Sequence, residues 1–246
     1  MIEGSAWREG VAQPEPVEKK VPVNRWDRTV DVATIVAALC AVVICVVVGW
    51  RVLGDSPQIV ANADRLIPEW RTYSKHGNWM GRRDAAVVIV EFGDYECSAC
   101  RAVAPHISAV RFAFPEDVAV VYRHWPPSYH RLAYPAARAA ECAALQGQFE
   151  PFHGWLYRDS EWMEDPRERF IAAASRIGMA NLEVFASCLD DPDPMETIER
   201  DVAAVEELGG AGTPTILVNG VLLGSLPDSL ELIERVADAL RNESGF

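Results

Sequence analysis

An apolar run that leads into a pair of cysteines constrains the fold of this chain more than any other stretch. Residues 85–90 are all apolar, Glu91 follows them, and residues 97–100 read Cys-Ser-Ala-Cys. A helical pattern begins at once, with apolar residues spaced by four, three and four at Val103, Ile107, Val110 and Phe114. The sequence therefore predicts a buried strand that leads into a helix through a CxxC motif.

The two cysteines of this motif have different expected reactivities. A thiolate, not a thiol, attacks a disulfide, and the N–H groups and dipole at a helix N-terminus stabilise a thiolate. We therefore expect Cys97 to be the attacking, solvent-facing sulfur, and Cys100, one turn into the helix, to resolve a mixed disulfide. Glu91 ends a buried strand, so we expect a raised pKa and a role in taking the proton from Cys100. The alternative for Glu91 is a side chain that points to solvent.

Zinc binding is the main alternative for a CxxC motif. A zinc site would require a second CxxC or an HxxxH motif, and the sequence contains neither. Four of the five histidines fall on different predicted elements without ligand spacing, so we interpret them as packing or loop residues; they are His106, His124, His130 and His153. We expect neither a metal nor a cofactor.

This set of residues resembles the active site of the thioredoxin superfamily, and specifically of the DsbA-like thiol–disulfide oxidoreductases. Members carry a buried acid six residues before the first cysteine, as Glu91 precedes Cys97 here. Many also carry a proline five residues after the second cysteine, where Pro105 stands. Residues 212–215, Gly-Thr-Pro-Thr, resemble the cis-proline loop that faces the motif in this family, although an ordinary turn is the alternative. The resemblance covers about residues 70–246.

The resemblance implies an α/β thioredoxin fold with a helical insertion, over residues 81–246. Residues 118–123 are apolar and β-branched, and predict a second strand parallel to the first. The patterns over about 127–210 are helical, which matches the insertion of DsbA-like proteins. Asn219-Gly220 between two apolar runs predicts a hairpin, and Asp228 is expected to cap a final helix.

The N-terminal part of the chain predicts a membrane anchor. Over residues 32–50, Thr34 is the only polar side chain apart from Cys40 and Cys45. At about 1.5 Å per residue, this stretch spans roughly the ~30 Å hydrocarbon core of a bilayer. We predict a transmembrane helix at 31–51, between a disordered cytoplasmic tail at 1–30 and a tether and lead-in at 52–80. A signal peptide is the alternative.

Charge sets the expected orientation of this helix. Four basic residues precede it closely, Lys19, Lys20, Arg25 and Arg28. Because positive charge favours the cytoplasmic side, we expect the N-terminus inside and the catalytic domain outside the cytoplasmic membrane. The net charge of −13 argues against a nucleic-acid partner.

Cys142 and Cys188 lie in the predicted helical insertion. Disulfides persist outside the cytoplasm, so we expect these two cysteines to form a structural bridge, as some DsbA-like proteins carry. Closing this loop would contribute about 4 kcal/mol in the chain-entropy model. A second redox pair that exchanges electrons with Cys97–Cys100 is the alternative.

The resemblance implies that the chain introduces disulfides into exported proteins through Cys97–Cys100. Its expected partners are reduced or unfolded exported proteins, bound beside Thr213 and Pro214, and a membrane electron acceptor of the DsbB or vitamin K epoxide reductase type. Two other functions stay open, a membrane-tethered reductase and a non-catalytic binding or chaperone module.

The residues around the motif differ from those of the strongest oxidases in the family. Strongly oxidising members carry a histidine between the cysteines, whereas this chain carries Ser98-Ala99. The flanking carboxylates of Asp94 and Glu96 should disfavour a thiolate at Cys97. We therefore expect a weaker oxidase.

Overall fold

The computed structural model describes residues 35–37, 41, 43, 64–192 and 195–243, and it divides the chain into two units, Met1–Gln58 and Ile59–Phe246. In the first unit, the described residues are helical. Within the described residues, no helix combines the length and apolar character needed to cross a membrane. Most of the predicted anchor at 31–51 and all of the tail at 1–30 lie outside the described residues, so both stay predictions.

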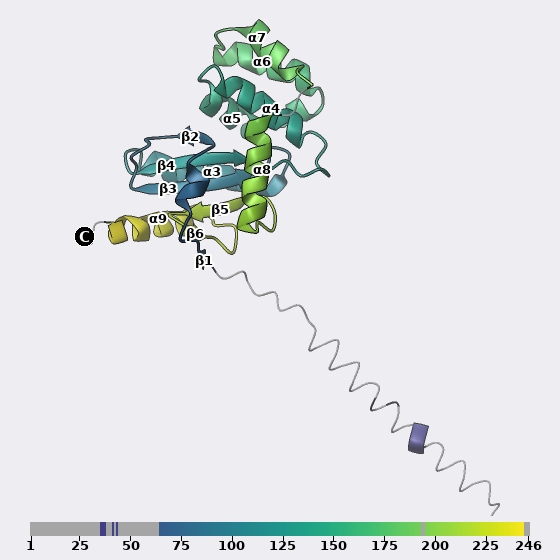
Figure 1. Ribbon diagram of the computed structural model, residues 1–246, viewed down its shortest axis with the longest axis vertical. Helices are drawn as coiled ribbons and strands as arrows, with labels where there is room; N and C mark the ends of the chain where they lie inside the picture. Colours follow the sequence, from purple (N-terminus) through teal and green to yellow (C-terminus); the bar gives the residue numbers. More distant parts are fainter. Residues whose placement is uncertain (1–34, 38–40, 42, 44–63, 193–194, 244–246) are drawn as a thin grey trace, which may run out of the picture. The chain divides into compact units, whose positions relative to one another are not determined.

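In the described part of the second unit, six strands form one sheet in the order β1-β6-β5-β3-β4-β2 (Figure 1). The strands are β1 (Arg65–Leu66), β2 (Asn78–Met80), β3 (Val87–Gly93), β4 (Val118–His124), β5 (Thr215–Val218) and β6 (Val221–Leu222). β3 and β4 are parallel, whereas the other neighbouring pairs are antiparallel. The predicted parallel pair and the predicted hairpin are confirmed.

Helices cover both faces of this sheet. On one face lie α3 (Ser98–Ala113) and α9 (Ser229–Glu243), and on the other lie α2 (Arg71–Ser74) and α8 (Glu196–Leu208). The backbone N–H of Glu231 donates to the Asp228 carboxylate at 2.9 Å, which is the predicted cap of α9.

The alternation of β3 decides which side chains meet α3. All seven residues of β3 are buried. Val87 and Ile89 pack in the core that includes α3, while Val90 and Phe92 pack in the core on the opposite face. Since successive side chains of a strand point to opposite faces, Glu91 points to the same side as Val87 and Ile89, toward α3.

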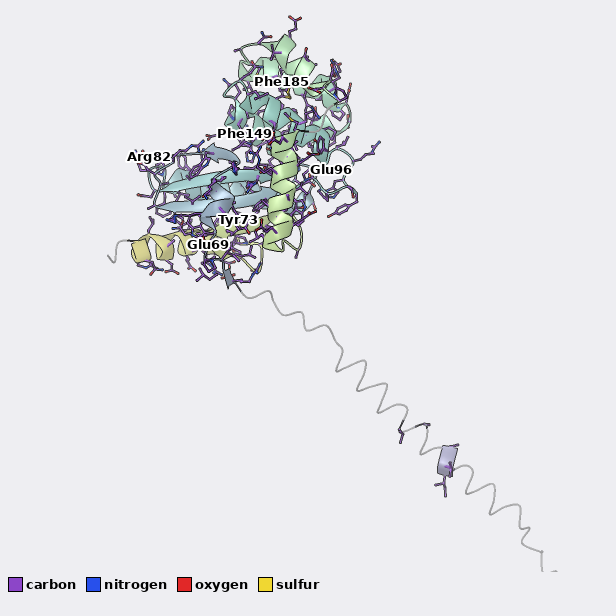
Figure 2. The ribbon with its side chains drawn as sticks, in the orientation of Figure 1. Glu69, Tyr73, Arg82, Glu96, Phe149 and Phe185 are labelled. Atoms are coloured by element: carbon purple, nitrogen blue, oxygen red, sulfur yellow. A yellow bond between two sulfur atoms is a disulfide. The ribbon has the colours of Figure 1, made fainter. Side chains whose placement is uncertain are left out.

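A helical insertion separates β4 from β5, as the resemblance implied. It contains α4 (Ala133–Ala144), α5 (Phe149–Arg158), the 3₁₀ helix η1 (Glu161–Met163), α6 (Pro166–Ile177), α7 (Leu182–Leu189) and α8. Figure 1 shows α4 to α7 grouped beyond one edge of the sheet, with α8 returning to the sheet. Phe185 lies within this group of helices (Figure 2) and packs on Phe152, with ring centroids 5.5 Å apart.

Cys142 of α4 and Cys188 of α7 form a disulfide. Their Cα atoms lie 5.9 Å apart and the two residues are 46 positions apart in the chain. The bridge therefore joins two helices of the insertion, where the sequence reasoning expected a structural bridge.

The sheet domain begins earlier than the predicted boundary at residue 81. Part of the segment predicted as tether and lead-in, residues 64–80, contributes β1, which pairs with β6, and β2, which pairs with β4. Trp70 packs against Gly220, where an added Cβ would lie 2.3 Å from Trp70 Cδ1. The lead-in is thus part of the sheet from residue 65 onward, because its short strands complete both edges of the sheet.

Candidate active site

The start of α3 holds the two cysteines of the CxxC motif. Cys97 is the N-cap residue of α3, with extended backbone at φ −70° and ψ 123°, and Cys100 lies in the first turn. Both are free thiols. The N–H groups of this first turn have no partner within the helix, so they are available to a negative charge on Cys97.

The two thiols differ strongly in their tendency to ionise. Cys97 is 8% exposed, less open to solvent than we expected, and Cys100 is fully buried. The pKa of Cys97 is lowered to about 5, mainly by a hydrogen bond from Cys100. Burial raises the pKa, but the Cys100 bond together with bonds from the Thr213 side chain and the first-turn N–H groups outweighs this effect. Burial, the bond to Cys97 and the charge of Glu91 raise the pKa of Cys100. At neutral pH the pair is therefore a thiolate at Cys97 beside a thiol at Cys100.

Glu91 lies inside the domain rather than pointing to solvent. Glu91 is only 1% exposed, and its Oε1 atom has no hydrogen-bond partner among the described residues. Burial raises its pKa to about 8. A carboxyl group with this pKa is mostly protonated at neutral pH, so it is a possible proton donor, and its charge when ionised raises the pKa of Cys100.

The loop before β5 faces the cysteines. The peptide bond between Thr213 and Pro214 is cis. The Thr213 carbonyl oxygen lies 3.4 Å from Cys97 Sγ. Both residues also line a cavity of about 780 Å³, together with Ile216, Leu223 and other residues. This loop is therefore not an ordinary turn, and its backbone can contact a peptide held beside Cys97.

Comparison with known proteins agrees with this geometry. A protein family described as thioredoxin matches residues 73–236. The chain belongs to this thioredoxin family. Among solved structures, it is similar to a thioredoxin-like oxidoreductase from Silicibacter pomeroyi DSS-3, with 28% identity and a TM-score of 0.57 over 67% of this chain and 92% of that one. It is also similar to oxidised BdbD from Bacillus subtilis, with 23% identity and a TM-score of 0.61 over 68% of this chain and 94% of that one.

Curated relatives match part of the same chain. The Na(+)/H(+) antiporter NhaA of Herminiimonas arsenicoxydans is 36% identical over 140 residues, which are 57% of this chain and 22% of that protein. The chain thus spans less than a quarter of the length of this relative. The family match makes the domain that includes residues 73–236 a thioredoxin-family domain, and the solved structures agree with its fold.

Sequence reasoning missed the hydrogen bonds made by Asp94 and Glu96 in this thioredoxin-family site. The Asp94 carboxylate accepts the N–H of Glu96 at 2.9 Å and also accepts a hydrogen bond from Nδ1 of His130, 36 positions away. The Glu96 carboxylate accepts the N–H of Leu132 at 2.6 Å. The charge of Cys97 does raise the pKa of Asp94, as expected for two groups that repel each other when both are charged. The pKa of Cys97 is nevertheless lowered, because its hydrogen bonds outweigh this repulsion.

A buried aromatic cluster lies behind Cys100 and Glu91. The hydroxyl groups of Tyr122 and Tyr157 are 2.9 Å apart, and Tyr95 Oη lies 3.0 Å from His153 Nδ1. Burial raises the pKa of each tyrosine, and the charges of Glu91 and Cys100 raise it further. Burial lowers the pKa of His153 to about 3, so its imidazole is neutral. No sequence pattern predicts this cluster, since its members come from three separate segments of the chain.

Proposed function

We propose that this chain is an extracytoplasmic thiol–disulfide oxidoreductase that introduces disulfides into exported proteins through Cys97–Cys100. The observation that carries this proposal is the asymmetry of the two thiols, with the pKa of Cys97 lowered to about 5 and that of Cys100 raised. A stabilised thiolate favours the reduced pair, so the oxidised pair is correspondingly ready to accept electrons.

The first step of the exchange forms a mixed disulfide. A client thiolate attacks Cys97 Sγ in the oxidised pair, the bond between Cys97 and Cys100 breaks, and its electron pair passes to the sulfur of Cys100. Glu91 donates the proton that converts this sulfur to a thiol. The backbone of Thr213 and Pro214 holds the client segment beside the mixed disulfide.

The second step releases the oxidised client. A second client thiolate attacks the client sulfur of the mixed disulfide, and Cys97 departs as a thiolate. The client loses two electrons and the pair of cysteines gains two. The low pKa of Cys97 makes it a good leaving group, which favours this direction.

A membrane electron acceptor of the DsbB or vitamin K epoxide reductase type would then reoxidise the pair. The apolar stretch at 31–51 and the basic residues before it support an anchored chain with its N-terminus in the cytoplasm. Modification of intact cells with a membrane-impermeant thiol reagent tests this placement. After the cells are treated with a membrane-impermeant reductant, which opens the Cys97–Cys100 disulfide, Cys97 should react in intact cells. Protection of Cys97 until the reduced cells are lysed would place the domain in the cytoplasm.

The direction of exchange is tested by the reduction potential of Cys97–Cys100 in the full-length, detergent-solubilised protein, titrated against glutathione. A value of about −120 to −180 mV, as in DsbA and protein disulfide isomerase, is expected for an oxidase. A value near about −270 mV, as in thioredoxin, would instead support the alternative of a membrane-tethered reductase.

The third possibility is a binding or chaperone module in which the cysteines are not used. A strain with Cys97→Ser and Cys100→Ser distinguishes it from both redox functions. We expect client proteins in this strain to accumulate with reduced cysteines if the chain is an oxidase, and with unreduced disulfides if it is a reductase. Unchanged client maturation would favour the non-catalytic module.

A further inference from the structure

The loop between β4 and α4, residues 125–132, is attached to the active-site loop by three hydrogen bonds. They run from Trp125 N–H to the Gly93 carbonyl at 2.8 Å, from His130 Nδ1 to the Asp94 carboxylate, and from Leu132 N–H to the Glu96 carboxylate at 2.6 Å. The last two bonds reach carboxylates directly before Cys97. The start of the helical insertion is therefore in direct contact with the surroundings of the nucleophile.

Asp94 is a carboxyl group that interacts electrostatically with Cys97: burial raises the pKa of Asp94, and the charge of Cys97 raises it further. Its side chain is fully buried. Its main-chain carbonyl accepts the N–H of Cys97 at 3.2 Å, so the two residues are fixed relative to each other. An unpaired carboxylate held in this position would oppose a negative charge on the Cys97 sulfur, because like charges in a poorly solvated site repel strongly.

His130 supplies the opposite charge at this position. Its side chain is 26% exposed, so the imidazole reaches both solvent and Asp94. Although partial burial lowers the pKa of His130, the bond to Asp94 and the charges of Asp94, Glu96 and Cys97 raise it overall. On its own loop, His130 lies between the Tyr129 ring, 4.6 Å away, and the exposed Arg131.

We propose that His130 is a positioning residue of the active site, which pairs with Asp94 and thereby keeps Cys97 in its thiolate form. The imidazolium cancels the charge of the buried carboxylate and leaves the first-turn N–H groups of α3 to stabilise the sulfur. This role rests on the proposed function, in which Cys97 is the attacking sulfur. The role is the same whether the chain acts as an oxidase or as a reductase.

Three variants of the full-length protein separate this electrostatic role from a structural one: His130→Gln, Asp94→Asn and the double variant. The rate at which iodoacetamide modifies the Cys97 peptide, followed by mass spectrometry against pH, reports the pKa of Cys97. His130→Gln should raise the midpoint by about one pH unit, since it leaves Asp94 unpaired. Asp94→Asn should lower the midpoint, and the double variant should return to within about half a unit of the unmodified chain, because both charges are gone.

Arg131→Gln is the matched control. It removes a positive charge next to His130 in the chain, but no contact of Arg131 with Asp94 occurs among the described residues, so the midpoint should stay unchanged. A midpoint that does not move in His130→Gln would overturn the proposal. So would a double variant displaced as far as His130→Gln, because a merely structural role of the loop would be lost in both.

The reduction potentials of the same variants test the role of His130 separately from the direction of exchange. A tenfold change in the exchange equilibrium corresponds to about 30 mV, so His130→Gln should shift the reduction potential by about that amount toward more reducing values. The potential of the unmodified chain alone decides between oxidase and reductase. The difference between the variants alone decides the role of His130.

Discussion

Replacing Glu91 by glutamine removes a buried titratable group while nearly keeping the shape of the side chain. The pKa of Glu91 is about 8 in the folded protein, against an ordinary value of 4.5. The folded protein therefore holds a proton at this site more tightly than the unfolded chain between these two pH values. The free energy of unfolding therefore falls as the pH rises from 4.5 to about 8. Below pH 4.5 Glu91 causes no such loss of stability.

The size of this loss follows from the same two values. Each pKa unit corresponds to about 1.36 kcal/mol, so the interval from 4.5 to pH 7 gives about 3 kcal/mol. Glu91→Gln lacks this term because an amide does not ionise. The free energy of unfolding of the variant should thus exceed that of the unmodified chain by an amount that grows by about 3 kcal/mol between pH 4.5 and pH 7.

Urea denaturation of both reduced proteins at a series of pH values measures this difference. Titration of Cys97 contributes to both curves and largely cancels in the difference. Any change in packing caused by the amide adds an offset that does not depend on pH. A difference that stays constant from pH 4.5 to pH 8 would refute the reasoning, because it would mean that Glu91 ionises in the folded protein as an exposed carboxylate does.

Two further substitutions test the site and the fold. Cys100→Ala should raise the pKa of Cys97 by about one to two units, since the hydrogen bond from Cys100 is the largest cause of the lowered pKa. The pH dependence of Cys97 alkylation measures this pKa. An unchanged pH dependence would mean that the helix N-terminus alone stabilises the thiolate. Gly220→Ala should cost about 3 kcal/mol in urea denaturation, because φ is +88° and the new Cβ would lie 2.3 Å from Trp70 Cδ1. The control Gly147→Ala, at φ +70° with nothing within 4 Å, should cost about 1 kcal/mol, and equal losses would contradict the packing argument.

The parts of the fold that depend on short-range patterns could be predicted from the sequence. Strand alternation places Glu91 on the face toward α3, and the spacing of the motif places Cys97 at a helix start. The hairpin at Asn219-Gly220 depends on two residues that tolerate positive φ, and both adopt it. The cis-proline loop required more than a local pattern, and only the family resemblance related residues 212–215 to the motif.

The edges of the sheet could not be predicted in this way. β1 and β2 contain two and three residues, which is too short for a period of two to stand out from a lead-in segment. Their pairing depends on where β6 and β4 lie, and this is a property of the assembled sheet.

The charges around Cys97 show the same limit in the active site. The sequence places two carboxylates, Asp94 and Glu96, close to the Cys97 sulfur. It does not show which groups bind these carboxylates in the folded domain. Their effect depends on His130 and Leu132, which arrive from a loop more than thirty positions away. The spacing of the motif does not predict a donor at that separation. The net electrostatic effect on the pKa of Cys97 could therefore not be obtained from the motif alone.

Three carboxyl groups within six residues of Cys97 would make a thiolate there unfavourable if all three were free and charged. The fold treats each one differently. Burial keeps Glu91 protonated up to a pH of about 8, the imidazole of His130 pairs with Asp94, and a backbone N–H binds Glu96. The Cys97 sulfur carries its own negative charge at the N-terminal end of α3, where N–H groups stabilise it. Glu91 stays mostly protonated below that pH, as the proposed transfer of its proton to Cys100 requires, over a range in which Cys97 is already a thiolate.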